Sequence, residues 1–182
     1  MSGADIERPI ATTLTFLKMD ARPIHTPPPR PLLRCAILQA EKPPVHFYRY
    51  LYNTIGRDYF WFDRRNWDDD KLAAMLDDAA VELYVLHVAG VPAGMAELDF
   101  RDPESCTLAY FGLMPDFIGR GIGPWLLHQA VEIAWQHPIS KLLVHTNTLD
   151  HPRALATYQR AGFEPYAREE RTIMVPSDFT PG

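Results

Sequence analysis

The sequence lacks several features that would assign it to particular protein classes. Its 182 residues include only two cysteines, Cys35 and Cys106, which lie far apart and form no disulfide or zinc-binding pattern. No run approaches the roughly 18 apolar residues of a membrane span, and the early acidic residues are unlike a signal peptide. We therefore expect a cytoplasmic protein with two buried thiols, no metal site and no membrane partner.

Positive charge is also scarce. Lysine and arginine number 18 against 23 aspartates and glutamates, which gives a formal net charge of −5. A nucleic-acid surface needs clustered lysine and arginine, so we expect no nucleic-acid partner. Hydrophobic residues make up 47% and charged residues 23% of the chain, which is ordinary for one globular domain of this length. The acidic balance is compatible with a cationic amine as ligand.

Proline, by contrast, is concentrated near the N-terminus. Residues 22–31 hold five prolines, a composition that removes backbone donors and favours extended chain. We interpret this stretch as a stiff connector, and divide the chain into an N-terminal extension, 1–31, and a domain, 32–182. Within the extension, residues 11–19 are rich in β-branched and apolar side chains and could form a strand.

The most informative pattern lies in residues 108–136. An apolar strand, 108–113, is followed by a loop with Gly119, Gly121 and Gly123, and then by a helix with apolar residues at helical spacing. Glycines let the main chain approach a ligand closely. The unpaired N–H groups of the first helical turn favour an anion such as pyrophosphate.

Two common phosphate-binding loops do not fit this spacing. A P-loop ends in Gly-Lys-Ser/Thr, whereas proline and tryptophan follow Gly123 here. A dinucleotide fingerprint needs a third glycine where this chain has Pro124 or Leu126. The loop instead resembles the coenzyme A loop of the GNAT N-acetyltransferases, in which backbone amides hold the pyrophosphate of acetyl-CoA.

A second pattern strengthens the resemblance. Residues 150–163 are similar to the family's other signature, Asn-x-x-Ala-x-x-x-Tyr-x-x-x-Gly-Phe. The matching residues are Ala154, Tyr158, Gly162 and Phe163. The chain also departs from the family pattern, because Ile118 stands at the Arg/Gln position of the first signature and His151 at the Asn position of the second.

The resemblance implies both a fold and a reaction. The fold class would be α/β, a GNAT-like mixed, twisted sheet flanked by helices in a single domain. The reaction would be direct transfer of the acetyl group of acetyl-CoA to a primary amine, on a small molecule or a peptide, in a ternary complex without a metal. A non-catalytic acyl-CoA-binding or regulatory module of the same fold is the alternative, and a homodimer is left open.

The coenzyme site implied by the resemblance comes from two strands and the glycine loop. Strand 110–113 would splay from strand 142–145, and its backbone would hold the pantetheine and the thioester carbonyl. The residues assigned to this site are Phe111, Leu113, Ile118, Gly119, Arg120, Gly121, Ile122, Gly123 and Asn147. Asp150 is interpreted as a cap of the next helix, with Pro152 in the first turn of that helix.

Acetyl transfer also needs an acid and a base. Tyr158 matches the tyrosine that acts as general acid in many family members. The family's glutamate on the fourth strand aligns with Thr107 here, so the base must be sought elsewhere. We take Glu97, a carboxylate in an otherwise apolar strand, ahead of Glu104, which reads as part of a turn. Cysteine catalysis is disfavoured, since neither thiol has a histidine beside it in sequence.

An acceptor pocket is predicted around residues 58–67, where five aromatic side chains surround an aspartate and two arginines. Trp61, Asp63 and Arg64 are the acceptor-binding residues that we select, and a loop simply anchored on the core is the alternative. Towards the C-terminus, residues 164–171 and 172–175 are expected to form two final strands, followed by a tail.

Overall fold

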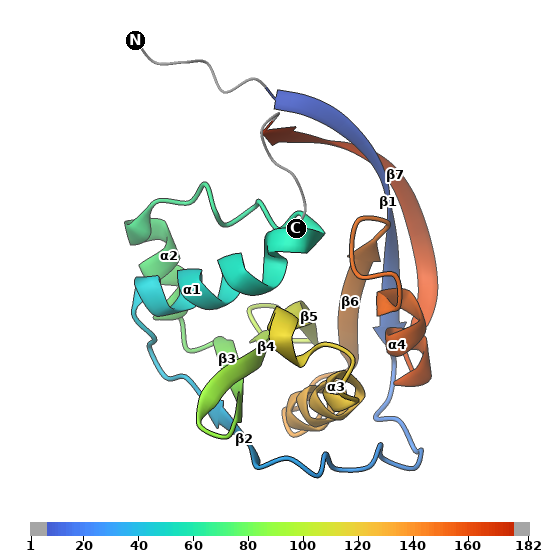
Figure 1. Ribbon diagram of the computed structural model, residues 1–182. Helices are drawn as coiled ribbons and strands as arrows, with labels where there is room; N and C mark the ends of the chain where they lie inside the picture. Colours follow the sequence, from blue (N-terminus) through green and yellow to red (C-terminus); the bar gives the residue numbers. More distant parts are fainter. Residues whose placement is uncertain (1–6, 177–182) are drawn as a thin grey trace.

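The computed structural model describes residues 7–176 (Figure 1), so the first six residues and the predicted tail from residue 177 lie outside it. Seven strands form one mixed sheet in the order β2-β3-β4-β5-β6-β1-β7. The strands are β1 (Glu7–Met19), β2 (Cys35–Gln39), β3 (Val81–Val88), β4 (Val91–Asp99), β5 (Ser105–Leu113), β6 (Lys141–Asn147) and β7 (Glu164–Pro176). The predicted fold class, a mixed sheet flanked by helices in a single domain, is confirmed.

Four α-helices and two short 3-10 turns, η1 and η2, complete the described part of the chain. They are α1 (Val45–Gly56), η1 (Arg57–Tyr59), α2 (Asp69–Leu76), η2 (Pro115–Phe117), α3 (Ile122–Ala134) and α4 (Ala154–Arg160). The helix predicted after the glycine loop is therefore present, and it begins at Ile122, so that Gly123 already lies in its first turn. Within residues 7–176, none of the helices is both long and apolar enough to cross a membrane.

The helices cover both faces of the sheet, and the side chains of β4 show how. Met95 is buried in a cluster with α1 and α2, whereas Ala96 and Leu98 are buried in a cluster with α3 and α4. Successive side chains of a strand point to opposite faces of the sheet. The α1 and α2 pair therefore covers one face, and α3 and α4 cover the other.

Strand β1 lies inside the sheet, between β6 and β7 (Figure 1). Its second half pairs antiparallel with β6, from Leu14 opposite Asn147 to Met19 opposite Leu142. The domain boundary predicted at residue 31 falls in the connector between β1 and β2, and β1 on its N-terminal side is part of the same sheet.

The expectation of two final strands is wrong, because residues 164–176 form the single strand β7. Strand β1 pairs with it from Glu7 opposite Pro176 to Lys18 opposite Glu164. Pairing with β1 satisfies the backbone hydrogen bonds of β7 on one side along this whole length. The strand therefore continues past residue 171 without a turn.

Strands β5 and β6 are parallel neighbours for only a short distance. They pair from Ser105 opposite Lys141 to Thr107 opposite Leu143, and beyond that point the structure has no pairing between them. The rest of β5 stays hydrogen-bonded to β4, up to Leu113 opposite Gly94. One edge of β5 is therefore free beyond Thr107, as the predicted splaying of this strand requires.

Candidate active site

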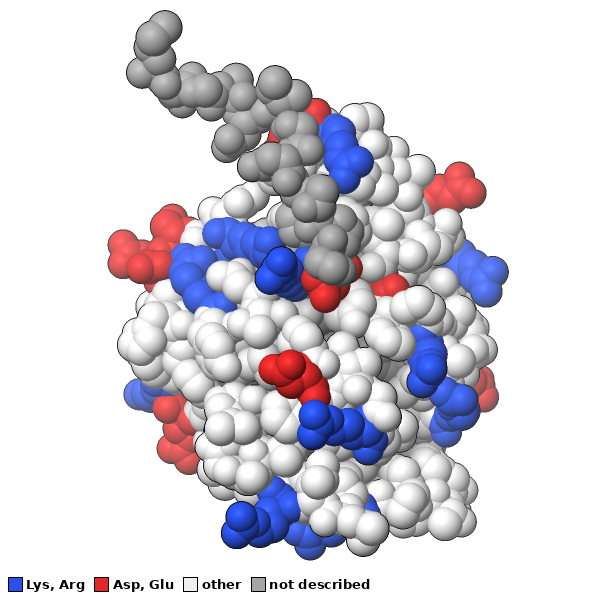
Figure 2. Space-filling model, in the orientation of Figure 1, with Lys and Arg blue, Asp and Glu red and all other residues white. Residues whose placement is uncertain are grey.

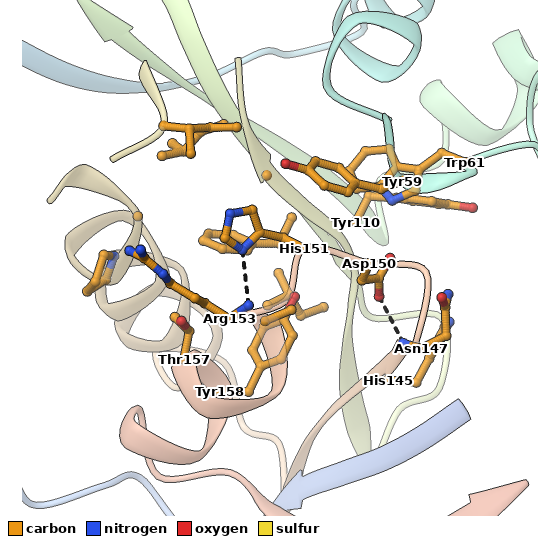
Figure 3. Close-up of a pocket in the computed structure, with 18 of the residues that line it drawn as sticks. Tyr59, Trp61, Tyr110, His145, Asn147, Asp150, His151, Arg153, Thr157 and Tyr158 are labelled. Atoms are coloured by element: carbon orange, nitrogen blue, oxygen red, sulfur yellow. Dashed lines mark hydrogen bonds between the residues drawn. The ribbon is translucent and has the colours of Figure 1, made fainter. Parts of the chain in front are cut away.

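A cavity of about 560 Å³ lies where β5 and β6 separate (Figure 3). One wall is the free part of β5, from Leu108 to Leu113, and the opposite wall is formed by the end of β6 and by α4. The glycine loop closes one end, and aromatic side chains from the segment after α1 close the other. The volume is typical of a small-molecule site.

The glycine loop has the backbone geometry that its composition suggests. Gly119 has a φ of 80° and Gly121 a φ of 72°, which lie in the left-handed region that disfavours other residues. Gly121 precedes the first residue of α3, and no side chain caps this helix. The N–H groups of the first turn therefore lack partners within the helix, although Pro124 contributes none. This end of the cavity is suited to an anion.

The structure brings most of the predicted coenzyme residues to the cavity. Those that line it are Phe111, Leu113, Ile118, Gly119, Gly121, Gly123 and Asn147. Arg120 is exposed, and its guanidinium carbon lies 5.2 Å from the centre of the Phe117 ring. Ile122 is fully buried in the core beside Trp125. Neither Arg120 nor Ile122 is among the side chains that line the cavity.

Two arginines that sequence reasoning did not select also line the cavity. Arg153 immediately precedes α4 and Arg160 ends it, and both are exposed. The sequence feature that could have identified these arginines is their position in the second signature, close to Tyr158. A guanidinium matches phosphate oxygens well, so these side chains add positive charge to the wall formed by α4.

Tyr158 lies on α4, and its side chain forms part of the cavity wall (Figure 3). It is buried, and its ring lies 6.2 Å from that of Phe111 and 5.8 Å from that of Phe163. Burial raises the pKa of the Tyr158 phenol, and the negative charge of Asp150 raises it further. The hydroxyl therefore keeps its proton at neutral pH.

Asp150 does not cap α4, so that interpretation of the sequence is wrong. The residue before the helix is Arg153, and no side-chain cap is present. The carboxylate instead accepts from the Thr146 hydroxyl at 2.6 Å and from the backbone N–H of Asn147 at 2.9 Å. A tight turn, in which the Asp150 N–H donates to the carbonyl of Asn147, directs it back to the end of β6. Burial raises the pKa of Asp150, and these hydrogen bonds offset part of that effect.

The opposite end of the cavity is an aromatic cluster. Trp61 lies 5.3 Å from Tyr52 and 4.9 Å from Tyr110, measured between ring centres. Asp63, which is exposed, lines the cavity beside them. Burial is the main cause that raises the pKa of Tyr52 and of Tyr110, and the charge of Asp63 adds to it. Trp61 and Asp63, two of the three predicted acceptor residues, therefore meet here.

Glu97 and Arg64 are brought together, but away from this wall. Both are buried on the α1 side of the sheet, where they form an ion pair. The Tyr48 hydroxyl also donates to Oε2 of Glu97 at 2.7 Å, and the Arg64 guanidinium carbon lies 4.5 Å from the Tyr110 ring centre. Neither residue lines the cavity. The roles predicted for them, base and acceptor ligand, stay predictions.

The other residues considered for chemistry lie elsewhere. Glu104 sits in an exposed turn, where its N–H donates to Asp102. Cys35 and Cys106 are free and buried, and burial raises the pKa of the Cys106 thiol, which disfavours a reactive thiolate. Across residues 7–176, no group of three His, Cys, Asp or Glu side chains is arranged to hold a metal ion. The expectation of a metal-free reaction stays a prediction.

Comparison with known structures gives neighbours of the same fold. A putative acetyltransferase from the GNAT family of Novosphingobium aromaticivorans is 17% identical with a TM-score of 0.62, over 94% of this chain and 68% of that chain. A GCN5-related N-acetyltransferase from Sphaerobacter thermophilus is 17% identical with a TM-score of 0.61, over 93% of this chain and 53% of that one. An IAA acetyltransferase from Bacillus cereus is 24% identical with a TM-score of 0.55, over 73% and 79%.

These identities are low, so the neighbours show the fold alone. The chain also spans only 63% of a functionally unknown conserved protein from Staphylococcus epidermidis that it resembles, with a TM-score of 0.58 and 13% identity. No curated protein matches the sequence at a significant level.

The family assignment rests on the sequence itself. The acetyltransferase (GNAT) family matches residues 48–163, which is well over half of the chain. The matched segment runs from α1 to the end of the second signature, and so includes the glycine loop, the free edge of β5 and Tyr158. With the fold and the cavity in agreement, this chain belongs to the acetyltransferase (GNAT) family.

Proposed function

We propose that this protein is an N-acetyltransferase that moves the acetyl group of acetyl-CoA to a primary amine by direct transfer in a ternary complex. One observation carries the proposal: a single cavity is lined at one end by the glycine loop, in its middle by the free edge of β5 and Tyr158, and at the other end by the aromatic cluster. This order supports the proposal, because acetyl transfer needs an anion site, a proton donor and an acceptor pocket next to one another.

The coenzyme end suits the phosphates of acetyl-CoA. The backbone at Gly119 and Gly121 is open, because a Cβ atom added at either position would meet no other atom within 4 Å. Arg153 and Arg160 supply positive charge on the neighbouring wall. The amide and carbonyl groups on the free edge of β5 are available to the pantetheine arm in the manner of a neighbouring strand.

Tyr158 supplies the proton that the reaction requires. The amine nitrogen attacks the thioester carbonyl, the new C–N bond forms, and the C–S bond breaks to release the coenzyme thiolate. The raised pKa of Tyr158 keeps its hydroxyl protonated until that moment. Protonation of the thiolate by Tyr158 then prevents the reverse attack on the new amide.

The acceptor end favours a cationic amine with an apolar or aromatic body. The arginines that line the cavity, Arg153 and Arg160, stand at the two ends of α4, whereas the carboxylates of Asp63 and Asp150 lie towards the aromatic cluster. An ammonium group is attracted both to carboxylates and to aromatic faces.

The partner that we propose is a small amine or an amine-bearing peptide, rather than a nucleic acid or a membrane. Figure 2 supports this, because on the face it shows lysine and arginine are interspersed with aspartate and glutamate among uncharged side chains. A nucleic-acid site would need a continuous basic surface. A homodimer is compatible with all of these features.

The proposal can be tested in two steps. Calorimetric titration should show that the protein binds acetyl-CoA and prefers it to NAD and ATP. Thiol release should then be followed with a panel of amines, namely 2-phenylethylamine, spermidine, an aminoglycoside and a lysine-containing peptide. Release of CoA that depends on one of these amines, with the acetylated product identified by mass spectrometry, supports the proposal.

The alternative is a non-catalytic acyl-CoA-binding module, which the departures at Ile118 and His151 favour. Tight binding of acetyl-CoA without turnover on any amine would support that module and contradict the enzyme. Absence of acetyl-CoA binding would contradict both.

A further inference from the structure

Asp150 occupies the cavity wall between the proton donor and the aromatic cluster. Figure 3 shows it between Tyr158 on one side and Tyr59, Trp61 and Tyr110 on the other. The titratable groups whose charges interact with it include His145 of β6, Tyr59 of η1 and Tyr158 of α4. His151 and Arg153, which follow it closely in the chain, line the same cavity. An amine that enters from the aromatic end would therefore meet this carboxylate close to the reacting centre.

In the part of the chain that the structure describes, donors reach one oxygen of this carboxylate. The Thr146 hydroxyl and the Asn147 N–H both donate to Oδ2. Within residues 7–176, Oδ1 receives no donor, and it is not sealed from solvent as an unpartnered buried atom would be. Two bonds thus fix the orientation of the carboxylate while the second oxygen stays free to accept a proton from a ligand.

Two other carboxylates, which the sequence analysis assigned to the site as a base and as an acceptor ligand, are placed differently. Glu97 is fully buried, paired with Arg64 and absent from the cavity wall. Asp63 lines the cavity but is exposed, so water competes for it. A general base must reach the proton that it removes, either directly or through one water. Of these carboxylates, Asp150 alone is partly buried, oriented by the protein and present in the wall.

We propose that Asp150 is the general base, and that it takes a proton from the ammonium form of the acceptor through its free oxygen. The inference rests on the proposed acetyl transfer. The ammonium gives one proton to Asp150, and the neutral nitrogen attacks the thioester carbonyl. A second proton leaves the nitrogen as the amide forms and replaces the one that Tyr158 gives to the thiolate. The products are the N-acetyl amine, CoA–SH and one proton on Asp150, which passes to water.

This assignment links the base to the acid. The negative charge of Asp150 is one of the two causes that raise the pKa of Tyr158. Once Asp150 has accepted a proton, that contribution disappears, and the phenol becomes a stronger acid when the thiolate departs. Burial raises the pKa of Asp150, which brings it closer to the pKa of the ammonium group from which it takes the proton.

The experiment compares Asp150→Asn with the wild-type protein on a matched pair of acceptors, 2-phenylethylamine and its β,β-difluorinated analogue, whose amine has a much lower pKa. With the ordinary amine, we expect kcat to fall by a factor of about 10² to 10⁴ while the Kd for acetyl-CoA stays within about threefold. With the fluorinated amine, which is largely neutral before it binds, most of the rate should return. A purely structural role for Asp150 would lower both rates equally.

The pH profile provides a second readout. The wild-type kcat/KM should lose activity on the acid side as Asp150 is protonated, and Asp150→Asn should instead follow the titration of the free amine. Thr146→Val removes a hydrogen bond that lowers the pKa of Asp150, so it should move the acid limb to higher pH. This milder variant tests the proposal even if Asp150→Asn folds poorly. Asp63→Asn is the matched carboxylate control and should raise KM without moving the acid limb.

The outcomes distinguish failure of the proposed acetyl transfer from failure of the assignment of Asp150 as the base. If the wild-type protein binds acetyl-CoA but acetylates none of the amines in the wider panel, the proposed function fails, and the base assignment fails with it. If the wild type turns over and Asp150→Asn keeps its full rate and its acid limb, only the assignment of Asp150 is overturned. Turnover in the panel by an amine other than 2-phenylethylamine moves the test to that amine and its fluorinated analogue.

Discussion

Glu97 and Asp150 are both carboxylates removed from bulk water, but they sit in contrasting surroundings. Glu97 lies beneath α1, where Arg64 and Tyr48 both reach its Oε2 and its Oε1 is closed in the core without a donor among residues 7–176. In the described part of the chain, Asp150 accepts from two neutral donors on one oxygen, and its other oxygen has no donor and is not closed in the core. Burial alone therefore does not indicate a catalytic base. The charge of the partner and access to the substrate distinguish the two.

Asp150 shares the cavity with Tyr158, the proposed proton donor. Substitution of Tyr158 is expected to have the largest effect on the reaction. Tyr158→Phe keeps the ring that packs against Phe111 and Phe163 but removes the proton. The single-turnover rate should fall by a factor of about 10² to 10⁴, whereas the Kd for acetyl-CoA should change little. Rapid-quench measurement of the acetylated amine is required, because slow product release could mask a loss in steady-state kcat.

Phe111→Leu is a suitable control for this variant, since it perturbs the same aromatic contact without touching the hydroxyl. If Tyr158→Phe retains the full single-turnover rate, the residue has only a packing role and a water molecule donates the proton.

The opposite side of the comparison is tested by Glu97→Gln. The substitution keeps the shape of the side chain but leaves the Arg64 charge buried without a counter-ion. Loss of one partner of a buried pair typically destabilises a protein by about 3–5 kcal/mol. Urea unfolding followed by tryptophan fluorescence should therefore show a clearly lower midpoint. An apolar double variant, Glu97→Leu with Arg64→Met, should recover much of this loss because neither buried charge remains.

If Glu97→Gln is as stable as the wild type but acetylates amines much more slowly, the original prediction that Glu97 is a base regains support. The comparison with Asp150 would then have to be reversed.

Sequence patterns predicted those parts of the molecule whose structure is set by near neighbours. The glycine loop and α3 follow from residues within one short stretch, and the positive φ values at Gly119 and Gly121 explain why glycine is needed there. The free edge of β5 was anticipated only through the family resemblance. Tyr158 was found in the same way, from its spacing to Gly162 and Phe163.

The features that the sequence did not reveal depend on pairing between distant segments. The strand potential of residues 11–19 is visible, but its position beside β6 depends on contacts such as that of Leu14 with Asn147. Arg64 and Glu97 were both selected as site residues, yet nothing in their spacing shows that they bind one another. Asp150 was interpreted as a helix cap because it stands just before α4 in the sequence. Its actual hydrogen bond, back to the N–H of Asn147, depends on the backbone path between the two residues, which the sequence does not show.

The third prediction concerns the anion end of the cavity and has a smaller expected effect. Alanine at Gly121 must adopt a φ near 72° or shift the loop, whereas Gly123 lies within α3, where an added Cβ would make an ordinary contact of 3.6 Å with Leu113. Gly121→Ala should raise the Kd for acetyl-CoA about tenfold, or ~1.4 kcal/mol, and Gly123→Ala should change it by less than about threefold. Calorimetric titration of the two folded variants measures both values. Equal affinities would show that the left-handed backbone at Gly121 does not shape the site.

The smallest expected effect is on the stability of Asp150→Asn as a function of pH. Measuring it compares the two carboxylates most directly. The folded protein raises the pKa of Asp150 above its ordinary value of 3.8, so the folded state holds this proton more tightly than the unfolded chain does. Asp150 therefore contributes most to stability below about pH 3.8, and that contribution is lost as the pH rises through the folded pKa. An asparagine does not titrate and loses nothing over this range.

The free energy of unfolding of Asp150→Asn, relative to that of the wild type, should consequently increase between acidic and neutral pH, which means that the variant gains relative stability. Urea titrations at a series of pH values measure this trend, and the change with pH matters more than the offset, which includes the altered hydrogen bonds to Thr146 and Asn147. Glu97→Gln should remain strongly destabilised at neutral pH, because it leaves the buried Arg64 charge without its partner. If Asp150→Asn instead loses stability relative to the wild type as the pH rises, then the ionised carboxylate is stabilised by the fold. Asp150 would then be a structural acceptor like Glu97 rather than a base held ready for the substrate.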